Sequence, residues 1–292
     1  MLLLDGSDAA IDRAAAILRS GGIAAFPTET VYGLGADAFN TRALARVFEA
    51  KERPRFDPLI IHLADRAELE RIADLDALDA RRRRLLDTLA GTFWPGPLTL
   101  VLPKRPEVPD LATAALPTAA IRVPRHPIAR RLIALSTGAV AAPSANPFGR
   151  LSPTTAAHVI EGLGDKIDCV IDGGPCEVGV ESTVLDLGSD TVRILRSGGI
   201  SREELEAAAG RGIITAAAYT EGGAAGPGML KSHYAPRVPL FLRRAGEMPA
   251  GGGALLFFSG ATRAAKAGDK AEAAETTLTL SESGSTLDAA AN

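Results

Sequence analysis

Cysteine, aromatic residues and long apolar runs are all scarce in this chain of 292 residues. The two cysteines, Cys169 and Cys176, are too few for a secreted fold held by disulfides, and with four histidines they do not indicate a zinc cage. Apolar stretches such as "ALLFF" fall far short of the roughly 20 residues that cross a bilayer, and "MLLLDGSD" at the start lacks the basic region of a signal peptide. We therefore expect a cytoplasmic protein whose cysteines are buried thiols.

Positive charge is not in excess either. The formal net charge is −3, the pI is about 5.9 and aromatic residues make up 4% of the chain, which argues against a surface that collects nucleic acid. The run "RRRR" at 81–84 has acidic residues on both sides in a helix-like pattern, and a solvated helix face is the favoured interpretation. Any cationic binding site must therefore be local.

The common nucleotide and hydrolase motifs are absent. The chain has no Walker A, HExxH, CxxC or GxSxG pattern. "GLGADA" at 33–38 has the spacing of a dinucleotide-binding turn, but "PTETVY" separates it from the strand predicted at 23–26. A dinucleotide site is therefore not predicted there.

Helices and strands alternate along the chain, which predicts an α/β fold. Helices are predicted at 7–20, from 41, from 65, and at 127–135, 154–163 and 201–209. Strands are predicted at 23–26, 59–63, 98–102, 121–123, 139–142, 169–172, 182–187 and 191–199. The last two strands follow each other without a helix between them, so we expect a twisted mixed sheet.

Composition divides the chain into three parts. Residues 1–209 form the main α/β unit, and residues 210–236 turn to Gly and Ala around "EGGAAGPG", which is typical of a linker. Residues 237–292 contain three predicted strands, "VPLFL", "GALLFF" and "TTLTLS", and we expect them to form a small, shortened or incomplete α/β domain. The linker ends in "KSHY", polar groups that a passive spacer does not need.

The stretch "KERPRFDPLIIH" places Lys51, Arg53 and Arg55 at the end of a helix, just before a buried strand. Such cations can bind a phosphate, or they can simply complement the negative end of the helix dipole. Similar short polar clusters stand at other strand ends, where open α/β sheets bind ligands. Taken singly, Thr30 and Ser182 would cap turns and His62 would be a core histidine.

Seven motifs in order resemble the YrdC-like threonylcarbamoyl-AMP synthases. They are "FPTETVYGLGADAF", "KERPRFDPLIIH", "FWPGPLTLVL", "AIRVPRHP", "APSANPFGRLSPT", "GVESTVLDL" and "ILRSGG", and the resemblance covers about residues 7–209. "PGMLKSHYAP" is similar to the linker of two-domain members. The resemblance implies a YrdC-like first domain, a linker that acts as a lid over the active site, and a Rossmann-like second domain.

The resemblance also implies an activity. Members of this family join L-threonine, bicarbonate or CO2, and ATP into threonylcarbamoyl-AMP with release of pyrophosphate, and Mg²⁺ accompanies the ATP. A separate transferase complex then modifies an adenosine beside the anticodon of tRNA, so tRNA is an indirect partner. No membrane partner is implied.

Site residues follow from the matching motif positions. The implied threonine-binding residues are Thr30, His62, Arg122 and Ser182. The implied nucleotide-binding residues are Lys51, Arg53, Asp57, Thr118, Ala142 through its backbone, Ser144, Asn146, Ser152, Arg196 and Tyr234. Lys51 and Arg53 are the implied catalytic cations, because in-line attack on the α-phosphate requires positioning and charge neutralisation more than a covalent group. No metal ligand is indicated.

The sequence departs from the family pattern at Glu52, where many relatives have Gly, and at Asp57, where many have Asn. A carboxylate at 57 would repel a triphosphate unless Mg²⁺ lies between them. Two alternatives stay open: a non-catalytic RNA-binding module, and a carbamoyl-adenylate-forming maturation domain. The acidic pI counts against the first, and the lack of zinc-finger cysteines counts against the second.

Overall fold

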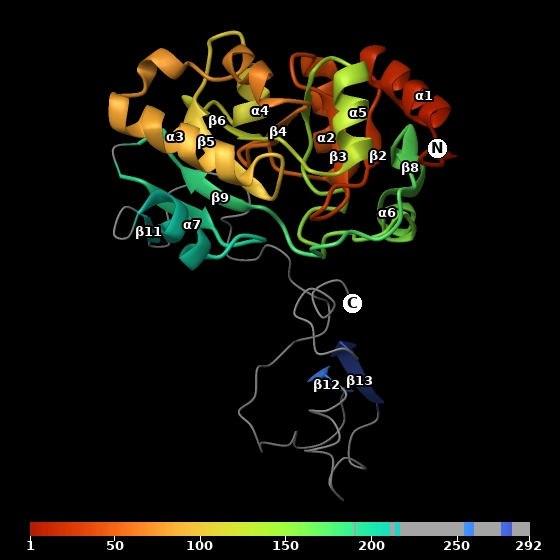
Figure 1. Ribbon diagram of the computed structural model, residues 1–292. Coiled ribbons are helices and arrows are strands. Elements are labelled where there is room, and N and C mark those ends of the chain that lie inside the picture. The colour runs from red at the N-terminus through yellow and green to blue at the C-terminus, as the bar shows by residue number, and fades with distance from the viewer. Residues whose placement is uncertain (190, 211–213, 217–253, 260–275, 282–292) are drawn as a thin grey trace, which may run out of the picture.

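Alternating helices and strands build one mixed sheet, as the sequence predicts (Figure 1). The computed structural model describes residues 1–189, 191–210, 214–216, 254–259 and 276–281. Its α-helices are α1 (Asp8–Arg19), α2 (Thr41–Lys51), α3 (Ala80–Phe93), α4 (Asp110–Thr113), α5 (Pro127–Leu135), α6 (Ala156–Leu163) and α7 (Arg202–Ala209). Its 3-10 helices are η1 (Arg66–Arg71), η2 (Leu75–Ala77) and η3 (Gly164–Lys166).

Eleven strands form the main sheet in the order β1-β8-β2-β3-β7-β4-β6-β5-β9-β10-β11. They are β1 (Leu2–Leu4), β2 (Ala24–Phe26), β3 (Gly33–Asp37), β4 (Ile60–Leu63), β5 (Leu98–Pro103), β6 (Thr118–Arg122), β7 (Ala139–Ala141), β8 (Cys169–Ile171), β9 (Thr183–Asp186), β10 (Arg193–Arg196) and β11 (Thr215–Ala216). Strands β4 and β6 pair in parallel, whereas β9 and β10 pair antiparallel. The prediction of a mixed sheet is confirmed.

Two further strands, β12 (Ala254–Ser259) and β13 (Thr276–Ser281), pair with each other in parallel. They correspond to the predicted strands "GALLFF" and "TTLTLS". The third predicted strand of that unit, "VPLFL", lies outside the described residues.

Capping residues explain why several helices begin where the sequence predicts. The hydroxyl of Ser7 accepts a hydrogen bond from the backbone of α1, and Asn40 does the same for α2. Helix α5 has Pro127 at its first position, where a missing N–H does no harm. Ser201 and Glu204 form a capping box at the start of α7.

Three local features differ from the sequence-based expectation. Leu2–Leu4 adds a short edge strand that pairs with β8. The segment after Asp65 is the 3-10 helix η1 rather than an α-helix. The glycine-rich "GLGAD" is strand β3, in which a side chain at Gly35 would lie 2.6 Å from a methyl group of Val140 and 2.7 Å from the ring of Phe26. Gly35 therefore allows close packing against β2 and β7 and does not form a phosphate-binding turn.

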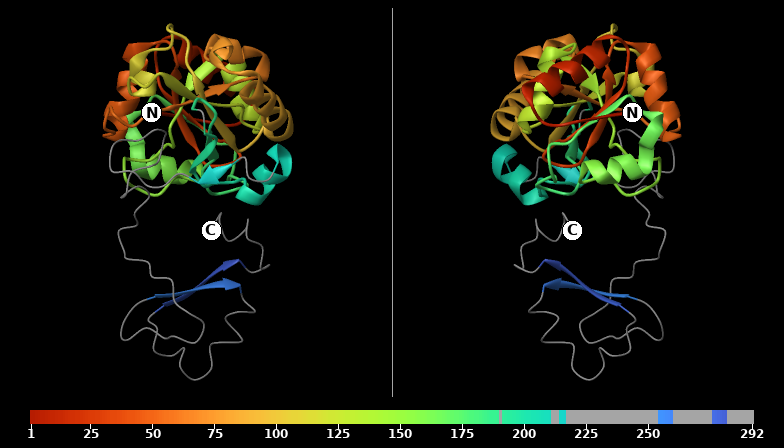
Figure 2. Two further views of the ribbon diagram at one scale, coloured as in Figure 1. Left: turned by 90° about the vertical axis from the view of Figure 1, so that its left-hand side faces the viewer. Right: turned by 90° about the vertical axis from the view of Figure 1, so that its right-hand side faces the viewer.

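Helices pack on both faces of the sheet, and each face has its own apolar core (Figure 2). On one face, α1 and α5 cover β2, β7 and β8, with Leu18, Phe26, Leu132 and Ile171 fully buried between them. The larger core on the other face receives side chains from α2, α3, α6 and α7. Strand residues alternate between these two cores.

This alternation decides where the polar strand residues point. Ile61 of β4 and Ile121 of β6 belong to the larger core, so their neighbours His62 and Arg122 point to the opposite face. His62 and Arg122 are paired across the two strands and therefore lie side by side. The half of this face that lies beyond α1 and α5, over β4, β6 and β9, carries the candidate site.

Candidate functional site

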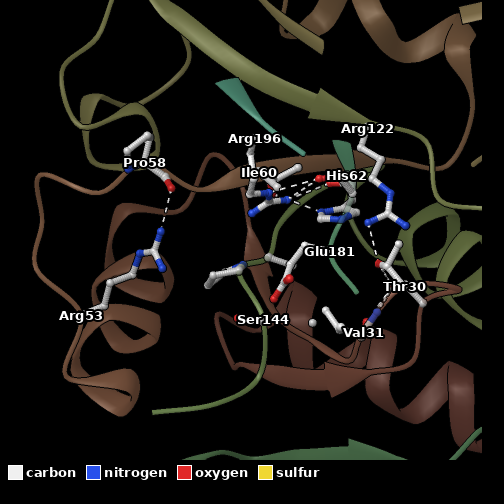
Figure 3. A pocket seen from close by; sticks show the side chains of 15 residues that line it. Thr30, Val31, Arg53, Pro58, Ile60, His62, Arg122, Ser144, Glu181 and Arg196 are labelled. Carbon is white, nitrogen blue, oxygen red and sulfur yellow. Dashed lines mark hydrogen bonds between the residues drawn. The ribbon is translucent and has the colours of Figure 1, made fainter. Parts of the chain in front are cut away.

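A pocket with about 500 Å³ of empty space, part of it open to solvent, lies over these strands (Figure 3). Its walls come from the loop after β2, the end of α2, strands β4 and β6, the loop after β7, and the segment from Glu181 to Arg196. The lining residues are Thr28, Thr30, Val31, Gly33, Arg53, Pro58, Ile60, His62, Arg122, Ala142, Pro143, Ser144, Glu181, Ser182 and Arg196.

Arg122 is held at three points although it faces the pocket. Its Nε–H donates to the carbonyl of Gly96 (3.1 Å), and Nη1 donates to the hydroxyl of Thr30 (2.9 Å). Nη2 lies 2.7 Å from a carboxylate oxygen of Glu29, in an ion pair whose two side chains are 4% and 1% exposed. The guanidinium therefore has a fixed orientation.

The hydroxyl of Thr30 has a defined direction. Thr28 Oγ1 donates its one proton to the carbonyl of Val31 (2.6 Å), so the 2.8 Å contact between the two threonine hydroxyls has Thr30 as donor. Thr30 also accepts from Arg122, so these two contacts fix its hydroxyl at the pocket wall.

His62 is a neutral, buried hydrogen-bonding group. Burial and the neighbouring positive charge of Arg122 lower the pKa of His62 to about 3, against the opposing effect of Glu29. Its Nδ1 lies 3.2 Å from the carbonyl of Ile60 and must donate to it, because a carbonyl only accepts. The neutral ring therefore presents Nε2 as an acceptor, which suits a ligand hydroxyl.

Arg196 joins β10 to the start of β9. Its Nη2 donates to the carbonyl of Ser182 (2.8 Å) and to the Ser182 hydroxyl (3.1 Å). That hydroxyl also lies 2.7 Å from Thr99 Oγ1 on β5. Three strands thus fix Ser182 and Arg196 at the pocket wall.

The cations of "KERPR" occupy three different environments. Arg53 lines the pocket and forms a buried ion pair with Asp57 (2.8 Å), while its Nη2 also donates to the carbonyl of Pro58 (2.9 Å). Lys51 is 1% exposed and does not line the pocket. Arg55 is exposed. The sequence predicts one cluster of cations, but the structure separates them.

Lys51 supports the loop after β7 from behind. Its ammonium donates to the carbonyl of Ser144 (2.5 Å) and to the carbonyl of Asn146. Burial, assisted by the positive charge of Arg53, lowers the pKa of Lys51 well below its ordinary value, although Asp57 opposes this. The side chain therefore acts on this loop, which carries Ser144 to the pocket.

Eight of the residues inferred from the sequence line the pocket together: Thr30, Arg53, His62, Arg122, Ala142, Ser144, Ser182 and Arg196. The backbone N–H of Ala142 already donates to Ile60, so its carbonyl is the group that remains for a ligand.

Five inferred residues do not line the pocket. Lys51 and Asp57 are buried behind it, and Asn146 donates to the carbonyls of Pro147 and Arg150. Ser152 contacts the pocket residue Glu181 through a hydrogen bond. Thr118 begins β6, four residues before Arg122. Tyr234 lies outside the described residues.

Sequence reasoning missed four residues of this site: Thr28, Glu29, Thr99 and Glu181. Thr28 and Glu29 stand within the quoted "PTETVYG", so a search for further polar residues in that motif could have found them. Glu181 is the one carboxylate among the described lining residues. Its position in a pocket lined by three arginines is a signal that only the structure gives.

Other chemistry is not supported in the described part of the chain. Among these residues no three His, Cys, Asp or Glu side chains group into a metal site, and no helix has the length and apolar character to span a membrane. Cys169 and Cys176 are free and buried, as expected, and burial raises the pKa of each thiol to about 12. Neither is poised as a nucleophile.

Two family models match the chain. The Sua5/YciO/YrdC model, described as "Telomere recombination", matches residues 16–198. A second model, "Threonylcarbamoyl-AMP synthase, C-terminal domain", matches residues 200–291.

Curated relatives carry consistent names. A threonylcarbamoyl-AMP synthase of Pyrococcus abyssi is 50% identical over 225 residues, which cover 76% of this chain and 64% of that protein. The Bacillus subtilis threonylcarbamoyl-AMP synthase is 46% identical over 239 residues, covering 81% of this chain and 67% of the relative. The matched region thus spans slightly less than two thirds of the first relative and about two thirds of the second.

A solved structure has the same fold. The crystal structure of P. abyssi Sua5 complexed with L-threonine matches 100% of this chain and 86% of its own, with a TM-score of 0.82 and 37% identity. Together with the family models, this shows that the chain belongs to the Sua5/YciO/YrdC family.

Proposed function

We propose that the protein makes L-threonylcarbamoyladenylate from L-threonine, bicarbonate or CO2, and ATP, with release of pyrophosphate. The observation that carries this proposal is the convergence of Thr30, His62, Arg122 and Ser182 with Arg53, Ser144 and Arg196 in one pocket. Two kinds of ligand group, a carboxylate and a phosphate, find donors within this single space. The threonine complex of P. abyssi Sua5 supports the choice of amino acid.

Threonine would bind at the Arg122 end of the pocket. The guanidinium can bind the substrate carboxylate through two parallel N–H groups. The acceptor Nε2 of His62 suits the threonine hydroxyl, because the ring is neutral. The residues therefore recognise the carboxylate, which all amino acids share, and the hydroxyl, which threonine has and alanine lacks.

The nucleotide would bind at the Arg53 and Arg196 end. These two guanidinium groups and the Ser144 loop would surround the phosphates, and Lys51 would hold that loop in place from behind. Such donors lower the barrier by positioning the carbamate for in-line attack on the α-phosphate and by balancing the developing charge. None of these residues forms a covalent bond to the substrate.

Magnesium fits this site through Glu181. In ATP-dependent enzymes this ion is usually held by one or two carboxylates together with substrate phosphates and water. Glu181 lines the pocket, and its carboxylate already accepts a hydrogen bond from Ser152. We propose Glu181 as the ligand that this chain would supply, and the ion would neutralise phosphate charge when bound.

Two species of this reaction decompose in water: the carbamate formed from threonine and CO2, and threonylcarbamoyl-AMP, which is a mixed anhydride. A linker that covers the pocket would protect both. We propose that residues 1–209 form the synthase domain, that residues 210–236 close over the site with Tyr234 at the ligands, and that residues 237–292 form the Rossmann-like domain. The match of residues 200–291 to the C-terminal family model supports a separate role for this part. Exclusion of water by a lid is a common way to protect such intermediates.

The product would be passed on. Threonylcarbamoyladenylate is an activated acyl group, and we propose that a downstream transferase complex moves it to tRNA beside the anticodon. Such a pathway would operate in the cytoplasm, where ATP and tRNA are available.

The experiment is a pyrophosphate-release assay with purified full-length protein, ATP and bicarbonate. Release should depend on L-threonine and should fall when L-threonine is replaced by L-alanine, which lacks the hydroxyl. Equal release with and without L-threonine would reject the proposed substrate.

A further inference from the structure

Glu29 is buried behind the pocket and is assigned no role by the reaction described above. It follows Thr28 in the loop between β2 and β3, its side chain is 1% exposed, and it does not line the pocket. A buried carboxylate requires charged or hydrogen-bonding partners, because its burial without them is strongly unfavourable.

The two carboxylate oxygens of Glu29 serve two different donors. One oxygen lies 2.7 Å from Nη2 of Arg122, and the other accepts the backbone N–H of Arg125 (3.0 Å). Arg125 follows Arg122 in the segment after β6. Glu29 therefore holds both the side chain of Arg122 and the backbone three residues beyond it.

The electrostatics support a permanent ion pair. Burial acts to raise the pKa of Glu29, but the positive charge and hydrogen bonding of Arg122 outweigh it, and the pKa lies below its ordinary value. Glu29 is thus ionised at neutral pH. Glu29 balances the charge of Arg122, so the pair carries no net charge. The binding of an anion by Arg122 therefore depends on the direction of its N–H groups.

The contacts of Arg122 define that direction. Its Nε–H donates to Gly96, Nη1 donates to Thr30, and Nη2 lies beside the carboxylate of Glu29. These contacts fix the plane of the guanidinium at the pocket wall, and a guanidinium held in this way can bind a carboxylate through its planar N–H groups. Without Glu29, Nη2 would lose its ion pair, and only the hydrogen bonds of Nε and Nη1 would orient the group.

We propose that Glu29 is a positioning residue for the α-carboxylate of the amino-acid substrate, acting through Arg122. This inference rests on the proposed function for the identity of the substrate. It differs from a merely structural role in one respect: loss of Glu29 should affect threonine much more than ATP, because Glu29 pairs with Arg122, at the threonine end of the pocket.

Glu29→Gln is the most informative variant. A glutamine has one acceptor oxygen, so it cannot serve both Arg122 and the N–H of Arg125. Glu29→Asp keeps two acceptor oxygens on a shorter side chain. The matched control is Glu177→Gln, because Glu177 is exposed and forms its ion pair with the side chain of Arg125 (2.6 Å).

The KM values are measured by steady-state pyrophosphate release. In Glu29→Gln the threonine KM should rise by roughly tenfold or more, because a charged hydrogen bond to the substrate carboxylate is weakened. The ATP KM should stay within about twofold of the wild-type value. Glu29→Asp should recover part of the threonine KM, and Glu177→Gln should behave as the wild type. An unchanged threonine KM in Glu29→Gln, or an equal rise in both KM values, would overturn the proposal. If Glu29→Gln does not fold, the KM split of Glu29→Asp decides the question in the same way.

A second readout separates this proposal from the proposed function. The Nε–H signal of Arg122 in a ¹H–¹⁵N spectrum, assigned by its loss in Arg122→Lys, should move in Glu29→Asp and stay in place in Glu177→Gln. A wild-type protein that releases no pyrophosphate with threonine would reject the substrate. An Arg122 signal unmoved by Glu29→Asp would reject the positioning role whatever the substrate is.

Discussion

The ammonium of Lys51 donates a 2.5 Å hydrogen bond to the backbone carbonyl of Ser144, and so joins the last residue of α2 to a wall of the pocket. The same ammonium donates to the carbonyl of Asn146. A lysine that the sequence places among phosphate ligands thus also shapes the loop that carries Ser144.

Replacing Lys51 with Met should therefore reduce both activity and stability. Two buried carbonyls would lose their donor, which typically costs about 1–3 kcal/mol of folding free energy. Displacement of the loop should lower pyrophosphate release by roughly 100-fold, because a shift of about 1 Å in a positioning group can cost that much. Lys166→Met is the matched control, because Lys166 forms a surface ion pair with Glu52. Wild-type turnover in Lys51→Met would contradict this account of the loop.

Arg122→Lys should affect threonine far more than ATP. A lysine keeps the positive charge beside Glu29 but cannot make the bidentate contact to a carboxylate. We expect the threonine KM to rise by roughly tenfold to 100-fold, corresponding to a charged hydrogen bond worth about 1.5–3 kcal/mol. Steady-state kinetics with each substrate varied in turn measure this, and Arg125→Lys, at an exposed ion pair, should leave both values unchanged. Parallel changes in the two KM values would mean that Arg122 does not define the threonine end of the pocket.

The free energy of unfolding should fall as the pH is lowered from 6.5 toward 3. Burial and Arg122 lower the pKa of His62 to about 3 in the folded protein, so in this window the unfolded chain binds one proton more than the folded chain does. The slope that His62 contributes is at most about 1.4 kcal/mol per pH unit. Half-buried His126, whose pKa burial also lowers, adds in the same direction.

Urea unfolding between pH 5 and pH 7 measures this slope, above the window in which carboxylates titrate. His62→Gln should flatten it, whereas substitution of the exposed His158 should not. An identical slope in His62→Gln and the wild type would show that His62 is not held neutral.

Glu181→Gln should raise the Mg²⁺ concentration needed for half-maximal activity by roughly tenfold, because an amide is a much weaker ligand than a carboxylate for this hard cation. Binding of Mn²⁺ in the presence of a non-hydrolysable ATP analogue, followed by electron paramagnetic resonance, gives a second measurement that does not depend on turnover. Glu177→Gln again provides the control. If metal affinity is the same in Glu181→Gln and the wild type, Glu181 does not hold the ion.

Removal of residues 220–292 should slow product formation if the linker is a lid. The truncated protein must keep the residues before 217, because β11 pairs with β10 at the sheet edge and Ile214 is fully buried. Comparing the yield of threonylcarbamoyl-AMP per pyrophosphate released tests the protection of the intermediates. A truncated protein with undiminished rate and yield would exclude this role.

Elements with strong local signals could be predicted from the sequence alone. Helix α5 has the bounds predicted, since Pro127 can start a helix and the apolar residues after it recur on one face. Strand β3 could not be recognised, because two glycines in five residues carry no apolar alternation. The need for glycine at position 35, close packing against Phe26 and Val140, arises from contacts that only the fold creates.

The site divides in the same manner. Thr30, His62, Arg122 and Ser182 could be inferred from the family resemblance, because each stands in one of its motifs, and all four line the pocket. Asp57 raised the question of repulsion from a triphosphate, and the structure answers it, since its carboxylate is fully buried against Arg53. Glu29 stands in a quoted motif, but its role could not be predicted there, because its partner Arg122 is 93 positions away and only the fold brings them together.

The most direct test of the central claim follows the carbon of bicarbonate. With labelled bicarbonate, ATP and L-threonine, the full-length protein should form a labelled adenylate of threonine in equal amount to the pyrophosphate released. It should form neither product when threonine or bicarbonate is left out. Pyrophosphate release that needs no bicarbonate, or an adenylate without the label, would show that this pocket does not assemble a carbamoylated amino acid on ATP.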